Sequence, residues 1–245
     1  MKNHPNACGA THVGKMRKVN QDSLLVKSGG FATLPNLFIV ADGLGGHNAG
    51  DIASAGAVQA FCDFLERAEG GIPHEHLMAN AITHANSIIY EKAGSNPDFK
   101  GMGTTFTSAV ISDGILHYAH VGDSRIYIVN DGVLTQITKD HAAGTIEMVA
   151  DGLITAREAK GYPEKVLIRA VGTDCDVEVD TGKVDLLGVT HILLCSDGLT
   201  NMVFENQILE IIQANVDIEN KVNELIDSAN GAGGADNITV ILMEL

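Results

Sequence analysis

The sequence contains no tryptophan, five prolines and four cysteines among its 245 residues. The cysteines are scattered without a CxxC pair; they are Cys8, Cys62, Cys175 and Cys195. This spacing argues against a disulfide framework and against a structural zinc site, so we expect reduced, mostly buried thiols. No apolar run approaches the roughly 18 residues that span a bilayer, and the amino terminus lacks the apolar core of a signal peptide. We therefore expect a cytoplasmic protein.

Positive charge is also scarce. The chain has 16 Lys and Arg residues against 31 Asp and Glu residues, which gives a formal net charge of −15. Nucleic acids and anionic membranes require a basic face that neutralises phosphates, so neither is an expected partner. An enzyme acting on a phosphorylated substrate would need local positive potential from bound metal ions and a placed arginine.

What the sequence does contain is a hydrophobic content of 45% and 27 glycines, which supports a substantial buried core. Apolar periodicity predicts strands at 7–13, 22–26, 37–41, 105–111, 115–121, 125–130, 133–137, 191–195 and 238–243, with others near Val166 and Val177. Amphipathic helices are expected at 49–66, 75–93, 205–214 and 218–229. This pattern predicts an α/β fold: a central antiparallel β-sandwich flanked by α-helices on both sides. By length alone, the 245 residues can form one domain or two.

Four predicted strands carry an aspartate where they end or begin; the four are Asp42, Asp123, Asp197 and Asp236. An Asp-Gly pair after a strand is most often only a turn. Recurrence at four strand ends instead indicates that the carboxylates meet at one rim of the sandwich, where Gly43 lets its backbone carbonyl approach a bound ion. Four carboxylates cannot stay ionised together without cations between them.

The available ligands narrow the choice of metal. Carboxylate, carbonyl and water are hard oxygen donors suited to magnesium, manganese or calcium, whereas zinc would require Cys and His clusters. We do not expect His74, His76 and His84 to be metal ligands. His74 and His76 are two residues apart on a helix and therefore do not share a face. A structural calcium site is the alternative, but ligands from four strand ends favour a binuclear centre, in which two cations about 3.5–4 Å apart activate a water.

Two further segments bear on function. The loop 14–21 holds three of the sixteen basic residues, including Arg17. It can be a solvated turn, but if it lies over the strand ends the planar guanidinium of Arg17 can bind a phosphate through two parallel hydrogen bonds. The segment 142–160 interrupts the strand pattern with two short helical pieces and has the character of a mobile lid.

Eight segments, in order along nearly the whole chain, resemble bacterial members of the metal-dependent Ser/Thr protein phosphatase family called PPM, or protein phosphatase 2C. They are 17–22 (RKVNQD), 40–47 (VADGLGGH), 103–105 (GTT), 121–125 (VGDSR), 134–141 (LTQITKDH), 169–172 (RAVG), 194–199 (LCSDGL) and 234–237 (GADN). Each segment alone is a weak signal, whereas eight in the same order are specific.

The resemblance implies a role for each candidate residue. By similarity, Asp42 bridges two tightly bound Mn²⁺ or Mg²⁺ ions, Gly43 gives its carbonyl to one, and Asp197 and Asp236 hold the other. Asp123 holds a third, weaker ion with Asp197, and Asp22 supports the metals through waters. Arg17 binds the substrate phosphate, and residues 142–161 correspond to the family's flap. Ser124 and Arg125 are interpreted as structural, with the arginine paired to a nearby acid.

The chain departs from the family pattern at two positions. Many members have an acidic residue where Gln21 stands, so one negative charge beside the metals is missing here. Eukaryotic members place a histidine directly after the Asp-Gly pair, proposed as the general acid, where this chain has Leu44; His47 lies three residues further on and need not substitute. The donor of the leaving-group proton is therefore left open, with a metal-bound water as a candidate.

The sequence therefore predicts an enzyme that hydrolyses phosphoserine and phosphothreonine in proteins by direct attack of a metal-activated water. Expected partners are phosphorylated proteins, either substrates of a Ser/Thr kinase or the kinase itself. One alternative is a catalytically silent PPM-like module that binds or regulates a phosphoprotein; retention of every metal aspartate argues against it. Another is a phosphatase dedicated to one regulatory partner, such as an anti-sigma antagonist.

Overall fold

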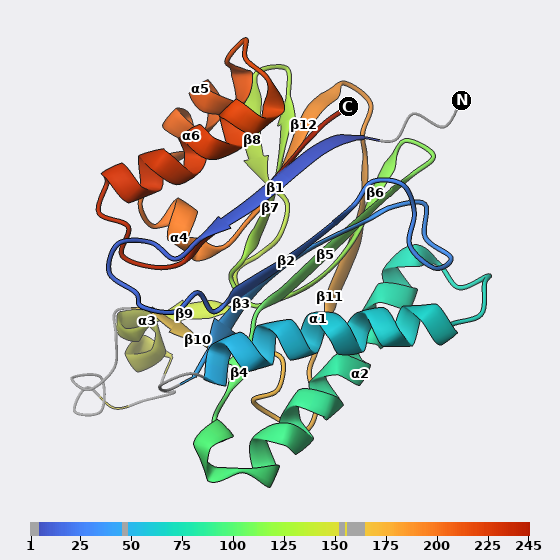
Figure 1. Ribbon diagram of the computed structural model, residues 1–245, viewed down its shortest axis with the longest axis vertical. Helices are drawn as coiled ribbons and strands as arrows, with labels where there is room; N and C mark the ends of the chain where they lie inside the picture. The colour runs from blue at the N-terminus through green and yellow to red at the C-terminus, as the bar shows by residue number, and fades with distance from the viewer. Residues whose placement is uncertain (1–4, 46–48, 152–154, 156–164) are drawn as a thin grey trace.

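The computed structural model describes residues 5–45, 49–151, 155 and 165–245. Two antiparallel sheets lie face to face, with helices on both outer sides (Figure 1). The predicted sandwich flanked by helices is confirmed.

The first sheet joins the two ends of the described chain. Its strand order is β1 (Asn6–His12), β13 (Ile238–Glu244), β12 (Val189–Cys195), β7 (Arg125–Asn130) and β8 (Val133–Gln136). The final strand β13 therefore lies inside the sheet, with antiparallel partners β1 and β12 on its two sides. Helices α5 (Glu205–Gln213) and α6 (Ile218–Gly231), with the short α4 (Asp197–Thr200), lie on the outer face of this sheet (Figure 1).

The second sheet has the order β11 (Asp180–Asp185), β6 (Ile115–Val121), β5 (Phe106–Ser112), β3 (Leu37–Leu44) and β2 (Asp22–Lys27), and β4 (Gly103–Thr104) pairs with β3. Helices α1 (Ala49–Arg67) and α2 (His74–Ser95), followed by the 3₁₀ turn η1 (Pro97–Phe99), cover its outer face (Figure 1). A small ribbon of β9 (Ala142–Gly144) and β10 (Lys165–Leu167), with α3 (Thr145–Ala150), lies beside one end of the sandwich (Figure 1).

The apolar run of β3 explains the layers. Phe38 and Val40 point into the core between the two sheets, whereas Leu37, Ile39 and Ala41 point into the core beneath α1 and α2. Because successive side chains of a strand point to opposite faces, a strand buried on both faces has no polar residue in its run. A third core lies between the first sheet and α4 to α6.

Several predicted boundaries were wrong. Strand β3 does not end at Ala41 but continues through Asp42 and Gly43 to Leu44, because β4 supplies a partner for its last residues. The strand expected near Val177 is β11, three residues later, an edge strand whose alternating burial rests on few apolar side chains. Of the two helical pieces expected in 142–160, α3 is present, preceded by β9; residues 152–154 and 156–161 of the predicted flap lie outside the described residues.

Candidate active site

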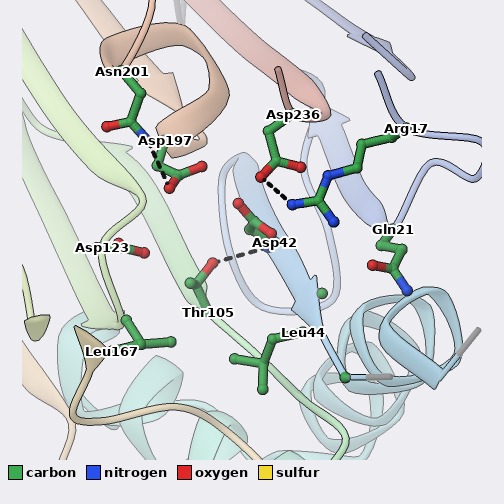
Figure 2. A pocket seen from close by; sticks show the side chains of 12 residues that line it. Arg17, Gln21, Asp42, Leu44, Thr105, Asp123, Leu167, Asp197, Asn201 and Asp236 are labelled. Atoms are coloured by element: carbon green, nitrogen blue, oxygen red, sulfur yellow. Dashed lines mark hydrogen bonds and ion pairs between the residues drawn. The ribbon is translucent and has the colours of Figure 1, made fainter. Parts of the chain in front are cut away.

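The predicted site residues converge on a cavity of about 610 Å³ at one rim of the sandwich (Figure 2). Its lining consists of Arg17, Gln21, Asp42, Gly43, Leu44, Gly45, Thr105, Asp123, Leu167, Asp197, Asn201 and Asp236. Both sheets contribute: Asp42 comes from β3 of one sheet, and Asp236 directly precedes β13 of the other. Figure 2 shows the four predicted strand-end carboxylates, with Arg17, around the same space.

Asp42 lies at the centre of this group, and its backbone is fixed on both sides. Its N–H donates to the Thr105 hydroxyl at 2.9 Å, and its carbonyl accepts from the Thr105 N–H at 2.8 Å and the Thr104 hydroxyl at 2.9 Å. The Thr105 hydroxyl in turn lies 2.7 Å from that of Ser124. The strand-end carboxylate is thus held by a rigid hydrogen-bonded frame, and the structural interpretation of Ser124 agrees with this contact.

Asp22 stands directly opposite Asp42 in the antiparallel pair β2–β3, so their side chains share one face of the sheet. Its Oδ2 accepts hydrogen bonds from Ser196 at 2.8 Å and Thr239 at 2.6 Å, two residues of the other sheet. Its buried Oδ1 has no hydrogen-bond donor among the described residues. Burial outweighs the two hydroxyl bonds and raises the pKa of Asp22 to about 6.

The electrostatics of Asp42 reflect the crowding of acids. Burial first, and then the negative charges of Asp22, Asp197, Asp236 and Asp123, raise the pKa of Asp42 well above its usual range. A cation among these groups would favour their ionised forms. The donor set and its charge therefore fit hard divalent cations.

Asp123 follows β6 in a turn whose preceding residue, Gly122, has to be glycine. Gly122 has φ +111°, and a Cβ there would collide with Thr105. His141 fastens the same turn, since its N–H donates to the Gly122 carbonyl at 2.7 Å and its Nδ1 accepts from the Gly122 N–H at 3.0 Å. Asp123 is thereby brought to the cavity from the second sheet.

Asp197 opens helix α4 directly after β12. Its Oδ2 accepts a hydrogen bond from Asn201 Nδ2 at 2.9 Å, one helical turn along the chain (Figure 2). A Cβ at Gly198 would collide with the Asn237 carbonyl, so the glycine allows α4 to approach the start of β13. This approach brings Asp197 and Asp236 to the same cavity.

Arg17 reaches the cavity, but its side chain already has a partner there. Its Nη2 lies 2.7 Å from Asp236 Oδ2 in an ion pair, and half of the arginine side chain is exposed (Figure 2). The loop 14–21 therefore does lie over the strand ends. The guanidinium has five N–H donors, so further donors remain for a phosphate beside the one given to Asp236.

Gly43 lines the cavity next to Asp42 and is tightly enclosed by backbone. A Cβ at this position would collide with the carbonyl oxygens of Gly50 and Gln21, and the Gly43 N–H donates to Gln21 O at 3.1 Å. Gln21 and Leu44, the two departures from the family pattern, also line the cavity. His47 and Asn48 lie outside the described residues.

The carboxylates surround the cavity without meeting at one point. Within the described ranges, no three His, Cys, Asp or Glu side chains are close enough together to hold a single ion. An ion bound here would draw its remaining ligands from water, as Mg²⁺ usually does, or from small movements of the side chains. His74 packs edge-on against His117, and His84 packs against Phe64, away from this cavity.

Arg125 pairs with Asp140, as its structural interpretation predicted. Its Nε and Nη2 donate to the two carboxylate oxygens at 2.9 and 2.8 Å, and its Nη1 donates to the Tyr127 hydroxyl at 2.8 Å. This bidentate pair does not line the cavity.

Sequence reasoning missed four residues that build the site: Thr105, Ser196, Asn201 and Thr239. Only Asn201 carried a usable signal, since it lies four residues after Asp197 on a helix that begins at a strand end. The Ser196 and Thr239 hydroxyls reach Asp22 across the two sheets, and the Thr105 hydroxyl reaches Asp42 from a neighbouring strand of the same sheet. A linear pattern shows neither kind of contact.

The chain is similar to known protein phosphatases over nearly its whole length. A family model described as protein phosphatase 2C matches residues 8–237. The serine/threonine phosphatase stp of Listeria monocytogenes is 39% identical over 240 residues, covering 96% of this chain and 93% of the relative. The protein phosphatase PhpP of Streptococcus pneumoniae is 35% identical over 242 residues, covering 96% and 95%. The crystal structure of the serine/threonine phosphatase Stp1 from Staphylococcus aureus superposes with a TM-score of 0.84 at 33% identity, covering 98% and 95%.

No helix in the described part of the chain is long and apolar enough to cross a membrane.

Proposed function

Because the chain belongs to the protein phosphatase 2C family and is a metal-dependent serine/threonine protein phosphatase, we propose that the cavity in Figure 2 is its active site. The observation that carries this proposal is the convergence of Arg17 with four carboxylates from separate strand ends on one cavity. A tetrahedral dianion needs positive charge, and in a chain with a net charge of −15 that charge has to be assembled locally.

We assign the metal ligands from the family resemblance, and the position of these residues around the cavity supports the assignment. Asp42 would hold both of two Mn²⁺ or Mg²⁺ ions, Gly43 would offer its carbonyl to one of them, and Asp197 with Asp236 would hold the other. Asp123 and Asp197 would hold a third, weaker ion. Asp22 would act on the ions through waters. Its position supports this role, because it stands opposite Asp42 on the neighbouring strand and does not line the cavity. When bound, the cations would activate a water for direct attack on phosphorus and neutralise charge on the phosphoryl group.

The residues of the chain itself orient the phosphate and the ligands. Arg17 presents its free N–H donors to the phosphate oxygens while its Nη2 remains beside Asp236. The frame of Thr104 and Thr105 fixes Asp42, and Asn201 fixes one oxygen of Asp197. Leu44 offers no proton, so we propose a metal-bound water as the donor to the leaving-group oxygen.

The substrates we propose are phosphoserine and phosphothreonine residues of proteins, made by a Ser/Thr kinase or carried by the kinase itself. We place the activity in the cytoplasm, since all four cysteines are free and reduced thiols suit that compartment. We further propose that residues 1–245 form a single phosphatase domain with a flap near 142–161.

Release of inorganic phosphate from phosphoserine and phosphothreonine peptides, with and without Mn²⁺, tests the proposal. We expect release that depends on Mn²⁺ or Mg²⁺, stops with a chelator, and is lost in Asp42→Asn. A protein that binds the phosphopeptide but releases no phosphate at any Mn²⁺ concentration would instead be the silent binding module.

A further inference from the structure

The loop that carries Arg17 has no strand partner. Residues 13–21 connect β1 to β2 through turns and bends, and residues 15–19 are exposed. A side chain that binds phosphate must nevertheless be held in one place over the cavity. The contacts that fix this loop therefore come from another part of the chain.

The side chain of Asn237 supplies them. This residue is 4% exposed, and its Nδ2 donates to the carbonyl of Val13 at 2.8 Å and to that of Val19 at 3.0 Å. Its Oδ1 accepts from the N–H of Gln21 at 2.8 Å. One amide thus holds both ends of the loop, using two donors and one acceptor that no other short side chain combines.

The residues before Asn237 hold the middle of the loop. The Gly234 carbonyl accepts from the N–H groups of Lys15 at 2.8 Å and Met16 at 3.1 Å. Gly14, at φ +79°, packs so closely on the Asp236 carbonyl that a Cβ there would collide with it. Asp236 Oδ2 then takes the Arg17 guanidinium, so the segment 234–237 holds the loop backbone and the arginine side chain together.

Hydrogen bonds of Gln21 connect the Arg17 loop to Gly43 of β3 and to Ser54 of α1. Gln21, whose N–H is held by Asn237, offers its own carbonyl to the Gly43 N–H at 3.1 Å and the Ser54 hydroxyl at 2.6 Å. The same amide therefore sets the spacing between the Arg17 loop and the backbone next to Asp42.

We propose that Asn237 is a positioning residue for the phosphatase reaction: its amide closes the loop 13–21 so that Arg17 stands at the cavity beside Asp236. This inference rests on the proposed role of Arg17 in binding phosphate. Asn237 itself does not line the cavity. Its loss should therefore weaken substrate binding through Arg17 and leave the metal ligands in place.

The test compares Asn237→Ala and Arg17→Ala, singly and together, with Asn36→Ala as a matched control. Asn36 is also a buried asparagine bonded only to backbone, with two hydrogen bonds to Ile111 at 2.7 Å, and it precedes β3 at the end opposite to Asp42. For each protein we measure phosphopeptide KM and kcat and the Mn²⁺ concentration for half-activation. We also measure the rate of trypsin cleavage after Lys15, Lys18 and, where it is present, Arg17.

We expect Asn237→Ala to raise KM at least about fivefold, with kcat and half-activating Mn²⁺ within about twofold of wild type. In the Arg17→Ala background the same change should add less than about twofold, because both act on one interaction. Cleavage after Lys15 and Lys18 should be faster in Asn237→Ala than in wild type or Asn36→Ala. This local readout does not depend on activity.

Different failures have different meanings. An unchanged KM in Asn237→Ala beside a raised KM in Arg17→Ala overturns the role of Asn237 and leaves the proposed function intact. An unchanged KM in Arg17→Ala overturns the phosphate role of Arg17 itself. A large rise in half-activating Mn²⁺ in Asn237→Ala would show that Asn237 acts through Asp236 and would also overturn the inference.

If Asn237→Ala does not fold, Asn237→Ser and the wild-type protein decide the question. Serine keeps one donor, so its KM should lie between those of wild type and Arg17→Ala. In wild type, the backbone N–H of Gln21 should exchange its hydrogen slowly although Gln21 lies outside any strand, because Asn237 Oδ1 accepts its hydrogen bond. Fast exchange of that amide would overturn the inference.

Discussion

Arg17 and Asp236, which are 219 positions apart in the sequence, form an ion pair of 2.7 Å at the mouth of the cavity. The pair joins the proposed phosphate-binding residue to a proposed metal ligand. A guanidinium and a bound divalent cation would therefore compete for the same carboxylate, while a phosphate dianion would attract both.

Replacement of Arg17 by alanine should raise the KM for a phosphopeptide about tenfold or more and change kcat little, because it removes a charged hydrogen bond made throughout the reaction. Half-activating Mn²⁺ should not increase, since Asp236 loses a competing cation. Steady-state kinetics at several Mn²⁺ concentrations measure both quantities. Lys18→Ala, in the same exposed loop, is the control; an unchanged KM in Arg17→Ala would show that the arginine does not hold substrate.

Asparagine at position 42 and at position 123 should have different effects on metal binding. Asp42→Asn should empty or disorder the pair of tight sites, because charge removed from a bridging ligand is lost to both ions. Asp123→Asn should leave the two tight sites occupied and reduce turnover strongly. Calorimetric Mn²⁺ titration together with phosphopeptide turnover separates these outcomes. Normal turnover by Asp123→Asn at saturating Mn²⁺ would remove Asp123 from the third site.

The Arg125–Asp140 pair should matter for stability more than for chemistry. Arg125→Met removes the bidentate partner of a mostly buried carboxylate, and we expect it to lower the free energy of unfolding by about 2–3 kcal/mol. Urea denaturation measures this change, and activity at saturating Mn²⁺ should largely persist below the melting temperature. The exposed Arg67→Met should change stability by less than about 0.5 kcal/mol. Loss of turnover in folded Arg125→Met would give Arg125 a role in the reaction.

Glu75, at the start of α2, gives the fold a predictable acid sensitivity. Burial opposes ionisation of Glu75, but hydrogen bonds from Lys183, the backbone and His117 outweigh it and lower the pKa of Glu75 to about 2. A carboxyl whose folded pKa lies below its unfolded value stabilises the fold above the unfolded pKa, and this contribution disappears as pH falls from about 4.5 towards 2. The stability difference between wild type and Glu75→Gln should therefore be largest near neutral pH and shrink below about pH 4.5.

Urea midpoints measured from pH 7 to pH 3 test this expectation. Glu91→Gln, an exposed change on the same helix, is the control and should show no comparable trend. A wild-type advantage over Glu75→Gln that grew on acidification would contradict the assigned partners.

Residues with a local signal were predicted well from sequence. The unbroken apolar run before Asp42 indicated a strand buried on both faces, and the structure places that strand between two cores. The gathering of Asp42, Asp123, Asp197 and Asp236 at one rim also followed from their repeated position at strand ends. Strand β11 was misplaced because it is an edge strand with little apolar periodicity for a pattern to detect.

Contacts between distant segments were beyond prediction. The Arg17–Asp236 pair, the hydroxyls of Ser196 and Thr239 on Asp22, and the amide of Asn237 on the Arg17 loop all depend on packing between distant segments, either across the two sheets or beside the β1–β13 strand pair. Neither propensity nor hydrophobic period encodes which polar side chain meets which backbone group across such an interface. These are also the contacts that decide how the candidate site is oriented.

The position of β13 between β1 and β12 has a consequence for synthesis on the ribosome. Strand β1 is made first, yet its sheet partner is β13, and Asp236 directly precedes that strand. A nascent chain can pair β2 with β3 and cover them with α1 and α2 early, while β1 has to wait for a partner more than 200 residues away. A chain still being translated before β13 has emerged should therefore have no phosphatase activity, because Asp236, a proposed metal ligand, is not placed at the cavity until that strand inserts between β1 and β12.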